Sequence, residues 1–306
     1  MVKATKRINP KIVTLARQLR RKLDEILLKD ERSVFLCGGN TTPERAYRRR
    51  LASSFASLRS NYYYKVFLAE DLFIDLLLGH EKRELVNLET SLARYVDLIV
   101  LFPESPGSFT ELGVFAFKED LGAKLVVVNH PKYRMSKGFI TYGPIRHMKT
   151  HNVGKVIYKA TDINHTDSMV REILDAAALF KVRGAQKTLL NPIYAFDYYL
   201  SLIYVMGPIP KDALIEISKK LLESEDTTVV QTVLSGLISE RKIILGSTGF
   251  SISSVGKQSL FAESKRPTKI RKLRPLMTNL RLEALDLTLR KNREGDSWGE
   301  IWSLDQ

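Results

Sequence analysis

One stretch of the chain combines residues that could act on a sugar. An apolar run that starts after Asp97 and ends at Phe102 leads into a segment rich in Pro, Ser and Gly, and Glu111 follows. We expect this segment to be a loop that wraps a ligand, with Glu111 in the first turn of the next helix, where the helix dipole keeps a carboxylate ionised. An ionised carboxylate beside a bound sugar is the nucleophile or oxocarbenium stabiliser of retaining glycoside chemistry. The same position would also suit a Glu111 that only satisfies the helix terminus.

Two other apolar runs end in distinctive residues. Residues 37–40, Cys-Gly-Gly-Asn, lead into a helix start, where two glycines let a ligand approach the backbone and free amides favour phosphate. We expect Thr41 to be the N-cap of this helix and Glu44 to close its capping box. A Gly-Gly turn after a strand is also common structure. Glu70 and Asp71 could hold ribose hydroxyls or could cap the next helix. We favour the capping role for Glu70 and the functional role for Asp71.

The elements that must position these residues alternate along the first half of the chain. Apolar runs lie at 33–36, 64–68, 98–102 and 125–128, with a weaker one at 156–158, and helical spacing separates them. This alternation predicts an α/β fold with an open, doubly wound parallel sheet of Rossmann-like or flavodoxin-like type. Ligands bind such sheets beyond the carboxyl ends of the strands.

The pattern changes around residues 184–192. Two helical segments, a strand–turn–strand segment over 242–253 and a further helix start follow in the order of a winged helix-turn-helix domain, and a generic small α+β domain is the alternative. Residues 12–28 form a helix whose basic side is either a solvated face or an arm that docks on nucleic acid or protein. We therefore divide the chain into a basic N-terminal helix (1–30), an α/β domain (31–183), a winged-helix domain (184–262) and a basic helical tail (263–306).

Charge is distributed unevenly. The 306 residues carry a net charge of +14, from 48 basic and 34 acidic residues. Residues 66–120 hold 11 acids and 4 bases, a balance of −7, so the rest carries +21. This contrast indicates small-molecule chemistry in one part and binding of a polyanion, with nucleic acid as first candidate, in another. The alternative is a basic surface that only keeps the protein soluble. The expected nucleic-acid contacts are Arg241, Lys242, Lys257, Lys265, Arg266, Lys269, Arg271, Lys272 and Arg274.

Other features set expectations about compartment and metals. Cys37 is the only cysteine, so no internal disulfide can form, which fits a reducing cytoplasm. We read Cys37 as a packing residue rather than a nucleophile. The five histidines lack metal-ligand spacing, so no metal site is expected. No secretory signal and no apolar run of about 20 residues is recognisable, so we expect a cytoplasmic protein without a membrane partner.

Four motifs carry a family resemblance. "FLCGGN", "AEDLF", "DLIVLFPESPGSFTELGVFA" and "FITYGPIR", between residues 34 and 146, closely resemble the nucleoside 2-deoxyribosyltransferase-like effector proteins of bacterial retrons. The resemblance implies a winged-helix domain behind the α/β domain. It also implies partners in anti-phage defence, namely the retron reverse transcriptase and its branched multicopy single-stranded DNA–RNA.

The resemblance also implies roles for site residues. Glu111 occupies the place of the family's nucleophile, and Asp71 and Asp97 are the candidates for the acids that orient sugar and base, Asp97 only if it does not lie at the start of its strand. The usual Gly-Thr-x-x-Glu spelling is absent, which favours cleavage of an N-glycosidic bond over nucleobase exchange. The residues that we expect to contact substrate are Cys37, Gly38, Gly39, Asn40, Glu70, Glu104, Ser105, Gly107, Ser108 and Phe109.

The leading hypothesis is a toxin-like retron effector that hydrolyses NAD, a nucleoside or a nucleotide. NAD suits the chemistry because its cationic nicotinamide leaves as a neutral ring without a strong general acid. It would be a substrate, and no cofactor is expected. The rival hypothesis is a non-catalytic nucleotide sensor coupled to a winged-helix DNA-binding regulator. The sequence leaves open whether the chain forms a homo-oligomer or a higher assembly.

Overall fold

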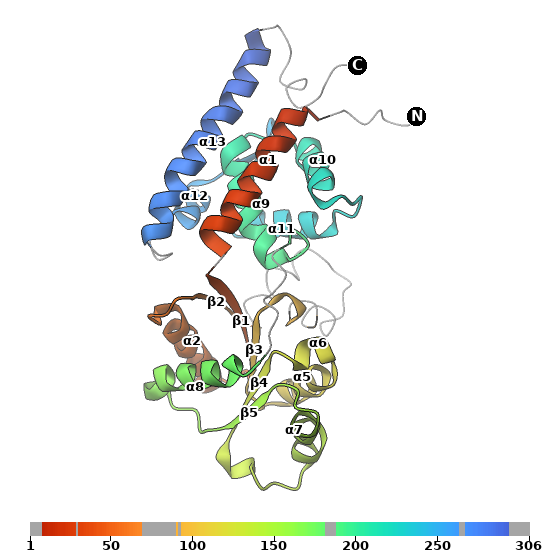
Figure 1. Ribbon diagram of the computed structural model, residues 1–306, viewed down its shortest axis with the longest axis vertical. Helices are drawn as coiled ribbons and strands as arrows, with labels where there is room; N and C mark the ends of the chain where they lie inside the picture. The colour runs from red at the N-terminus through yellow and green to blue at the C-terminus, as the bar shows by residue number, and fades with distance from the viewer. Residues whose placement is uncertain are drawn as a thin grey trace. The chain divides into compact units, whose positions relative to one another are not determined.

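The chain forms two compact units. The computed structural model describes residues 8–28, 30–68, 90, 93–180, 188–262 and 267–293. One unit is Asp30–Gln186, and the other joins Met1–Lys29 to Lys187–Gln306. We call them the α/β unit and the helical unit (Figure 1).

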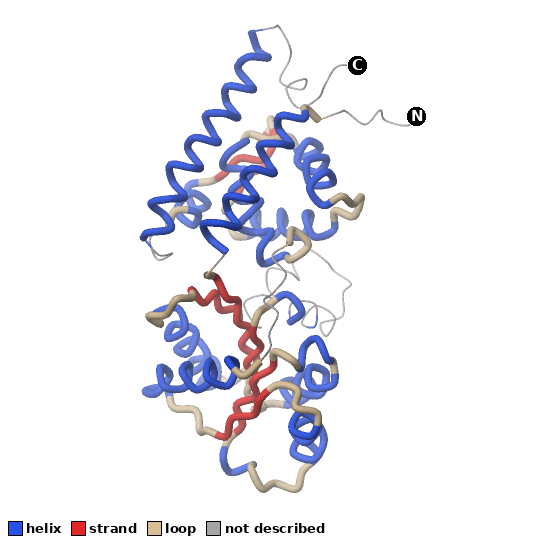
Figure 2. The backbone as a smooth tube through the Cα atoms, in the orientation of Figure 1, coloured by secondary structure: helices blue, strands red, loops and turns tan. Residues whose placement is uncertain are grey.

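The α/β unit is built on a parallel sheet, as the apolar runs predict (Figure 2). Within the described residues the sheet has five strands in the order β2-β1-β3-β4-β5, and every neighbouring pair is parallel. Because β1 is flanked by β2 and β3, the direction in which strands are added reverses between β1 and β3. The strands are β1 (Glu31–Cys37), β2 (Tyr63–Leu68), β3 (Leu98–Leu101), β4 (Leu125–Asn129) and β5 (Lys155–Tyr158).

Helices cover both faces of this sheet (Figure 1). Alternate residues such as Val34, Val100 and Val126 pack against the helices α2 (Thr42–Ser57) and α8 (Thr166–Ala178). The opposite face is covered by α5 (Pro106–Phe117), α6 (Glu119–Gly122) and α7 (Arg146–Thr150). Three single turns complete the unit: η2 (Pro131–Tyr133), η3 (Thr141–Ile145) and η4 (Ile163–His165).

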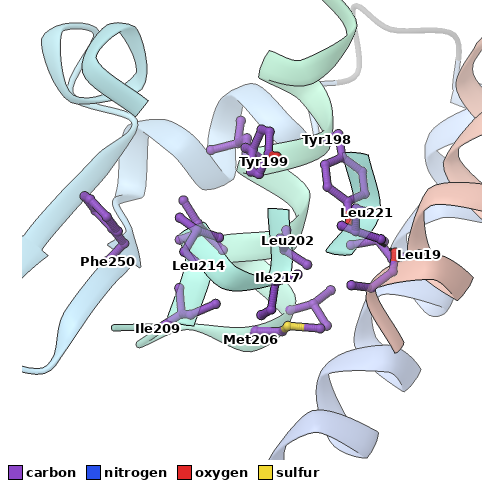
Figure 3. Packing of buried hydrophobic residues seen from close by; sticks show 14 of the residues in the cluster. Leu19, Tyr198, Tyr199, Leu202, Met206, Ile209, Leu214, Ile217, Leu221 and Phe250 are labelled. Carbon is purple, nitrogen blue, oxygen red and sulfur yellow. Dashed lines mark hydrogen bonds between the residues drawn. The ribbon is translucent and has the colours of Figure 1, made fainter. Parts of the chain in front are cut away.

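The helical unit packs around α9 (Pro192–Met206). This helix is apolar on most of its circumference, and Tyr198, Tyr199 and Leu202 are fully buried within it (Figure 3). Such a helix needs neighbours on all sides. They are α1 (Pro10–Leu23), η1 (Asp24–Leu28), α10 (Lys211–Leu222), α11 (Thr228–Ser239), β6 (Ile243–Gly246), β7 (Gly249–Ile252), α12 (Ser254–Leu260) and α13 (Pro267–Arg293).

The N-terminal helix α1 belongs to this core. Ala16 and Leu19 are fully buried in the same cluster as α9, and the Tyr198 hydroxyl donates to the Ala16 carbonyl at 3.1 Å. The Tyr194 hydroxyl donates to Asp24 Oδ1 at 2.8 Å. Three segments that we separated on sequence thus share one core: the basic N-terminal helix, the region after residue 187 and the C-terminal helix. Each has an apolar stripe that the others bury.

The helices and hairpin of this unit follow the predicted order. β6 and β7 are antiparallel and are joined by a turn at residues 247–248, after which β7 begins at Gly249, whose φ of 123° suits glycine. Ile209 adds an isolated antiparallel bridge to Phe250. The winged-helix assignment itself stays a prediction. Among the described residues, no helix is both long and apolar enough to span a bilayer.

Replacement of Leu19 by alanine tests whether α1 is part of the helical unit. Leu19 is fully buried, so truncation should lower the free energy of unfolding by about 2–5 kcal/mol. Lys11→Ala, at an exposed position of the same helix, should change it by less than about 0.5 kcal/mol. Urea denaturation followed by circular dichroism measures both, and equal effects would contradict the shared core.

Candidate functional site at the carboxyl ends of β1 and β3

The candidate site lies where the strand order reverses. Cys37 at the end of β1 pairs with Leu101 at the end of β3, and the Phe102 N–H donates to the Cys37 carbonyl at 3.0 Å. The chain leaving β1 therefore runs beside the chain leaving β3. Ligands of doubly wound sheets bind at this reversal, so the geometry agrees with the position that the sequence predicts.

Gly38 and Gly39 form the turn after β1, and charged side chains of the protein crowd the space around them. Neither has a φ in the left-handed region, so backbone conformation is not the reason. A Cβ on Gly38 would lie 2.9 Å from Arg48 Nη1 and 3.2 Å from Glu104 Oε2, and one on Gly39 would lie 2.1 Å from Glu44 Oε2. The glycines leave room for charged side chains of the protein itself, and the approach of a ligand to this turn stays a prediction.

Arg48 is a site residue that the sequence analysis missed. It is 2% exposed, and its Nη1 donates a short hydrogen bond to the Gly39 carbonyl. Helix α2 buries Arg48 together with Leu51 and Phe55, which follow at the spacing of one helical face. A basic residue in an apolar helical stripe is the signal that could have revealed it, because a buried charge needs partners.

Helix α2 also places a carboxylate at this turn. The Thr41 N–H donates to Glu44 Oε2 at 2.9 Å, which completes the expected link between the helix start and Glu44. The helix begins at Thr42 with Thr41 as N-cap, as predicted. Glu44 and Arg48 are four residues apart, so both reach the Gly38–Gly39 turn from one face.

Glu104 extends from the end of β3 to the same turn. Its Oε2 accepts the Gly39 N–H at 3.3 Å. Burial raises the pKa of Glu104 above its ordinary value, the Gly39 hydrogen bond lowers it, Glu44 raises it, and Arg48 lowers it. The net direction is upward. A carboxyl group with a raised pKa at a strand end can exchange protons closer to neutral pH than an ordinary glutamate.

Tyr47 lies beside this carboxyl group. Its ring packs edge-on against Phe102 with centroids 5.6 Å apart. Burial, and then the charge of Glu104, raise the pKa of the Tyr47 hydroxyl, which therefore stays protonated. Among the described residues, this buried hydroxyl has no hydrogen-bond partner. A buried phenol beside a carboxyl group is a further polar group that sequence reasoning did not find.

Helix α5 begins earlier than the sequence analysis expects. Ser105 is its N-cap and Pro106 its first residue, so Gly107 and Ser108 belong to the first helical turn and not to a ligand loop. Pro is favoured at this position and the Ser105 side chain accepts the Ser108 N–H, which explains the early start. The expectation that Glu111 lies in the first turn is wrong: it lies in the second, where the helix dipole acts weakly.

Ser108 connects Glu104 to the helix that carries Glu111. It is 1% exposed, and its Oγ accepts the N–H groups of Glu104 at 2.9 Å and Ser105 at 2.8 Å. Glu111 follows Ser108 by three residues, on the same helical side, and is half-buried. The backbone of Glu104 is thus tied to the first turn of α5, and Glu111 follows in the second turn.

Asp97 is not brought to this site. It precedes β3, at the opposite edge of the sheet, and its Oδ2 accepts the Ser33 N–H at 2.7 Å and the Ser33 hydroxyl at 2.8 Å. The four residues of β3 separate it from Phe102, and five steps of roughly 3.3 Å give about 16 Å. Asp97 joins the starts of β1 and β3, which is a structural role.

The remaining predicted substrate contacts are placed unevenly. Cys37 is fully buried in the sheet, whereas Asn40 and Gly107 are exposed, and Phe109 is 39% exposed. Glu70 and Asp71 lie outside the described residues. The structure therefore brings together the turn after β1, Glu104, Ser105 and Ser108, and it adds Arg48, Glu44 and Tyr47.

The described residues among the predicted nucleic-acid contacts lie just before the hairpin, on α12 and on α13. Arg241 is exposed before the hairpin, Lys242 forms a short ion pair with Glu240, and Lys257 is exposed on α12. On α13, Lys269 is half-buried, and the three exposed bases are Arg271, Lys272 and Arg274. Lys265 and Arg266 lie outside the described residues.

Metal ligands do not gather in the part of the chain that the structure describes: it contains no group of three or more His, Cys, Asp or Glu side chains suited to an ion. The chemistry that the site residues offer is that of carboxyl groups, a phenol and a guanidinium group.

Comparison with known proteins supplies a family. The model of the STM3845 retron effector protein family matches residues 44–244. The chain is 32% identical over 276 residues to an Escherichia coli protein of retron Ec86, covering 85% of this chain and 86% of that one. It is 33% identical over 215 residues to a counterpart of retron Ec73, covering 63% and 67%. Both relatives carry the name "putative ribosyltransferase/DNA-binding protein".

Glu104→Gln should stabilise the protein at neutral pH. The raised pKa of Glu104 means that the folded state disfavours its charged form. Above the folded pKa the charged group therefore lowers the free energy of unfolding, and this destabilisation disappears as pH falls toward the unfolded pKa of about 4.3. The gain in unfolding free energy of the variant should therefore be largest at pH 7.5 and shrink toward pH 4.5. Urea denaturation across this range tests it, with exposed Glu119→Gln as control. A loss of stability at pH 7.5 would show that charge-dependent hydrogen bonding outweighs burial.

Proposed function

The chain belongs to the STM3845 retron effector family, and on that premise we propose that its α/β unit cleaves the N-glycosidic bond of NAD, a nucleoside or a nucleotide. The observation that carries the proposal is that Glu104, at the end of β3, reaches the Gly38–Gly39 turn and is tied through Ser108 to α5, whose second turn holds the half-buried Glu111. The names of the two E. coli relatives, which include ribosyltransferase, support a reaction at a sugar carbon.

Glu111 is the proposed nucleophile. Its carboxylate attacks the anomeric carbon, the C–N bond breaks, and the base leaves with the bonding electrons. Water then attacks the same carbon of the glycosyl–enzyme ester, which releases the sugar and restores the Glu111 carboxylate. Nicotinamide leaves NAD as a neutral ring, so that substrate needs no proton donor in the first step.

Glu104 is the proposed proton carrier. Its raised pKa suits a group that protonates a departing nucleobase and later takes a proton from the attacking water. Arg48 moderates this property, because its positive charge opposes the raised pKa of Glu104. Asp71, which lies outside the described residues, remains a proposed sugar-orienting acid. Asp97 is not included, because it lies at the other edge of the sheet.

The helical unit is proposed to bind the nucleic-acid partner. The order of α10, α11 and the β6–β7 hairpin supports a winged-helix domain, and the relatives' names include DNA-binding protein. We propose that the exposed bases of α13 and the hairpin region contact the retron's multicopy single-stranded DNA–RNA held by its reverse transcriptase. In this proposal the complex restrains or triggers the effector.

Glu111→Gln should abolish base release and leave the fold intact. The change removes the charge and keeps the shape, and loss of a covalent catalyst costs roughly three or more orders of magnitude in rate. The assay is chromatography of free base after incubation with NAD and, separately, with deoxynucleosides and nucleotides. Glu119→Gln is the matched control, because Glu119 is an exposed glutamate of the same unit.

The outcomes separate two functions. Base release by the Glu111→Gln variant at the parent rate would overturn the nucleophile assignment. A parent protein that binds nucleotides and releases no base from any substrate would instead support the ligand-sensing regulator. Calorimetric titration of both proteins with the same substrates distinguishes lost binding from lost chemistry.

Simultaneous replacement of Arg271, Lys272 and Arg274 by glutamine should weaken binding to single-stranded DNA–RNA. Each lost phosphate contact lowers the log–log salt slope by about 0.7, so the slope should fall by about 2. The comparison variant replaces three exposed bases of α1, Lys11, Arg17 and Arg21. Salt-titrated fluorescence anisotropy measures both, and an unchanged slope in the α13 variant would contradict the proposed contact.

A further inference from the structure

A second basic region lies in the α/β unit, separate in sequence from the predicted nucleic-acid contacts of the helical unit. Between His130 and Lys159 the sequence contains seven Lys or Arg residues and no Asp or Glu. The same segment carries four aromatic residues besides its histidines, namely Tyr133, Phe139, Tyr142 and Tyr158. This composition contrasts with the acidic balance of residues 66–120 in the same unit.

Large apolar side chains of this segment are exposed. Met135 is 87% exposed, Phe139 83%, Tyr142 53% and Tyr133 45%. Scattered exposed apolar side chains are normal, but four within ten residues are an unusual local concentration. The segment from β4 to α7 forms a loop that projects from the sheet on the side of the edge strand β5 (Figure 1).

Cations lie directly against the aromatic rings. Lys132 Nζ is 4.8 Å from the centroid of Tyr133, and His130 meets the same ring at 6.2 Å between centroids. Lys149 Nζ lies 4.9 Å from the centroid of Tyr158 and donates to its hydroxyl at 3.1 Å. These contacts orient the rings and keep positive charge beside their faces.

A third cation joins the two rings into one surface. Arg134, next to Tyr133 in the chain, lies 5.7 Å from the centroid of Tyr158. We call this set, Lys132, Tyr133, Arg134, Lys149 and Tyr158 with the exposed rings of Phe139 and Tyr142, the aromatic–basic surface. Lys159 is not part of it, because it forms a short ion pair with Glu172.

The position of this surface relates it to the candidate site. His130 follows β4, and Tyr158 is the last residue of β5, so both lie at the carboxyl edge of the parallel sheet. Gly38 and Glu104 lie at the same edge. β5 is two strands from β3, about 10 Å at roughly 4.8 Å per strand.

We propose that the aromatic–basic surface binds single-stranded nucleic acid, with bases stacked on its exposed rings and phosphates beside its cations. Aromatic side chains interleaved with Lys and Arg are the features that hold unpaired strands, because every base has a face to stack and every linkage has a charge. In a duplex the base faces are covered, so exposed rings favour the single strand. The inference uses neither Glu111 nor the proposed reaction.

The test measures binding of labelled 16-nucleotide oligo-dT and oligo-U to the full chain by fluorescence anisotropy. Tyr133→Ala with Tyr142→Ala should weaken binding by roughly tenfold or more, since each stacked base contributes substantially. Replacement of Lys132, Arg134 and Lys149 by glutamine should lower the salt slope by about 2. Tyr62→Ala is the matched control, because Tyr62 is 42% exposed and also has a cation over its ring, Arg32 at 4.3 Å from the centroid, but lies before β2, at the amino edge of the sheet.

Further measurements test whether the aromatic–basic surface binds single strands. All variants are also measured with Arg271, Lys272 and Arg274 replaced, so that contacts of the helical unit do not hide the effect. Equal weakening by Tyr62→Ala, or unchanged binding in the Tyr133 and Tyr142 variant, would overturn the proposal. Equally tight binding of a 16-base-pair duplex or of poly-glutamate would also overturn it, because charge alone would then explain the attraction. Binding of vesicles of phosphatidylserine and phosphatidylcholine without binding of oligonucleotides would assign the surface to a membrane instead.

Discussion

The carboxyl ends of β1 and β3 lie side by side, and the candidate site depends on this one feature of the sheet. The hydrogen bond from Phe102 to Cys37 sets the two exits next to each other, and the two glycines after β1 then leave enough room for Arg48 and Glu104 to approach. Any side chain at Gly38 would enter the space between these charges. The turn, the helix α2 and the end of β3 therefore form one interdependent arrangement.

Burial of charge has opposite consequences for the two central side chains. Arg48 remains charged in a protein interior and so must donate to partners such as the Gly39 carbonyl. Glu104 responds instead with a raised pKa, because a carboxyl group can take up a proton when its charged form is poorly solvated. The charged form of Glu104 is therefore held at a strand end at a cost in stability.

The helical unit obeys a simpler constraint, which is apolar area. α9 has apolar side chains around most of its circumference, and segments from both ends of the chain bury them. The bases of α1 and α13 are then left outside this core, where they can meet a polyanion. Ring–cation contacts occur in both units: at Tyr133 and Tyr158 in the α/β unit, and at Phe261 in the helical unit, where Arg274 lies 5.5 Å from the ring centroid.

The sequence by itself determined the parallel α/β fold and the start of α2, and it pointed to the strand ends as the place of the candidate site, because apolar runs, glycines and capping residues act locally. It could not decide where α5 begins relative to Glu111, since the local preference of Ser105 and Pro106 competed with a reading of the same residues as a loop. Only the tertiary structure separated Asp97 from Glu104, because residues at the two ends of one short strand look close in sequence. It alone showed Arg48 and Tyr47 at the site and α1 in the core of α9, because these contacts join segments that are remote along the chain.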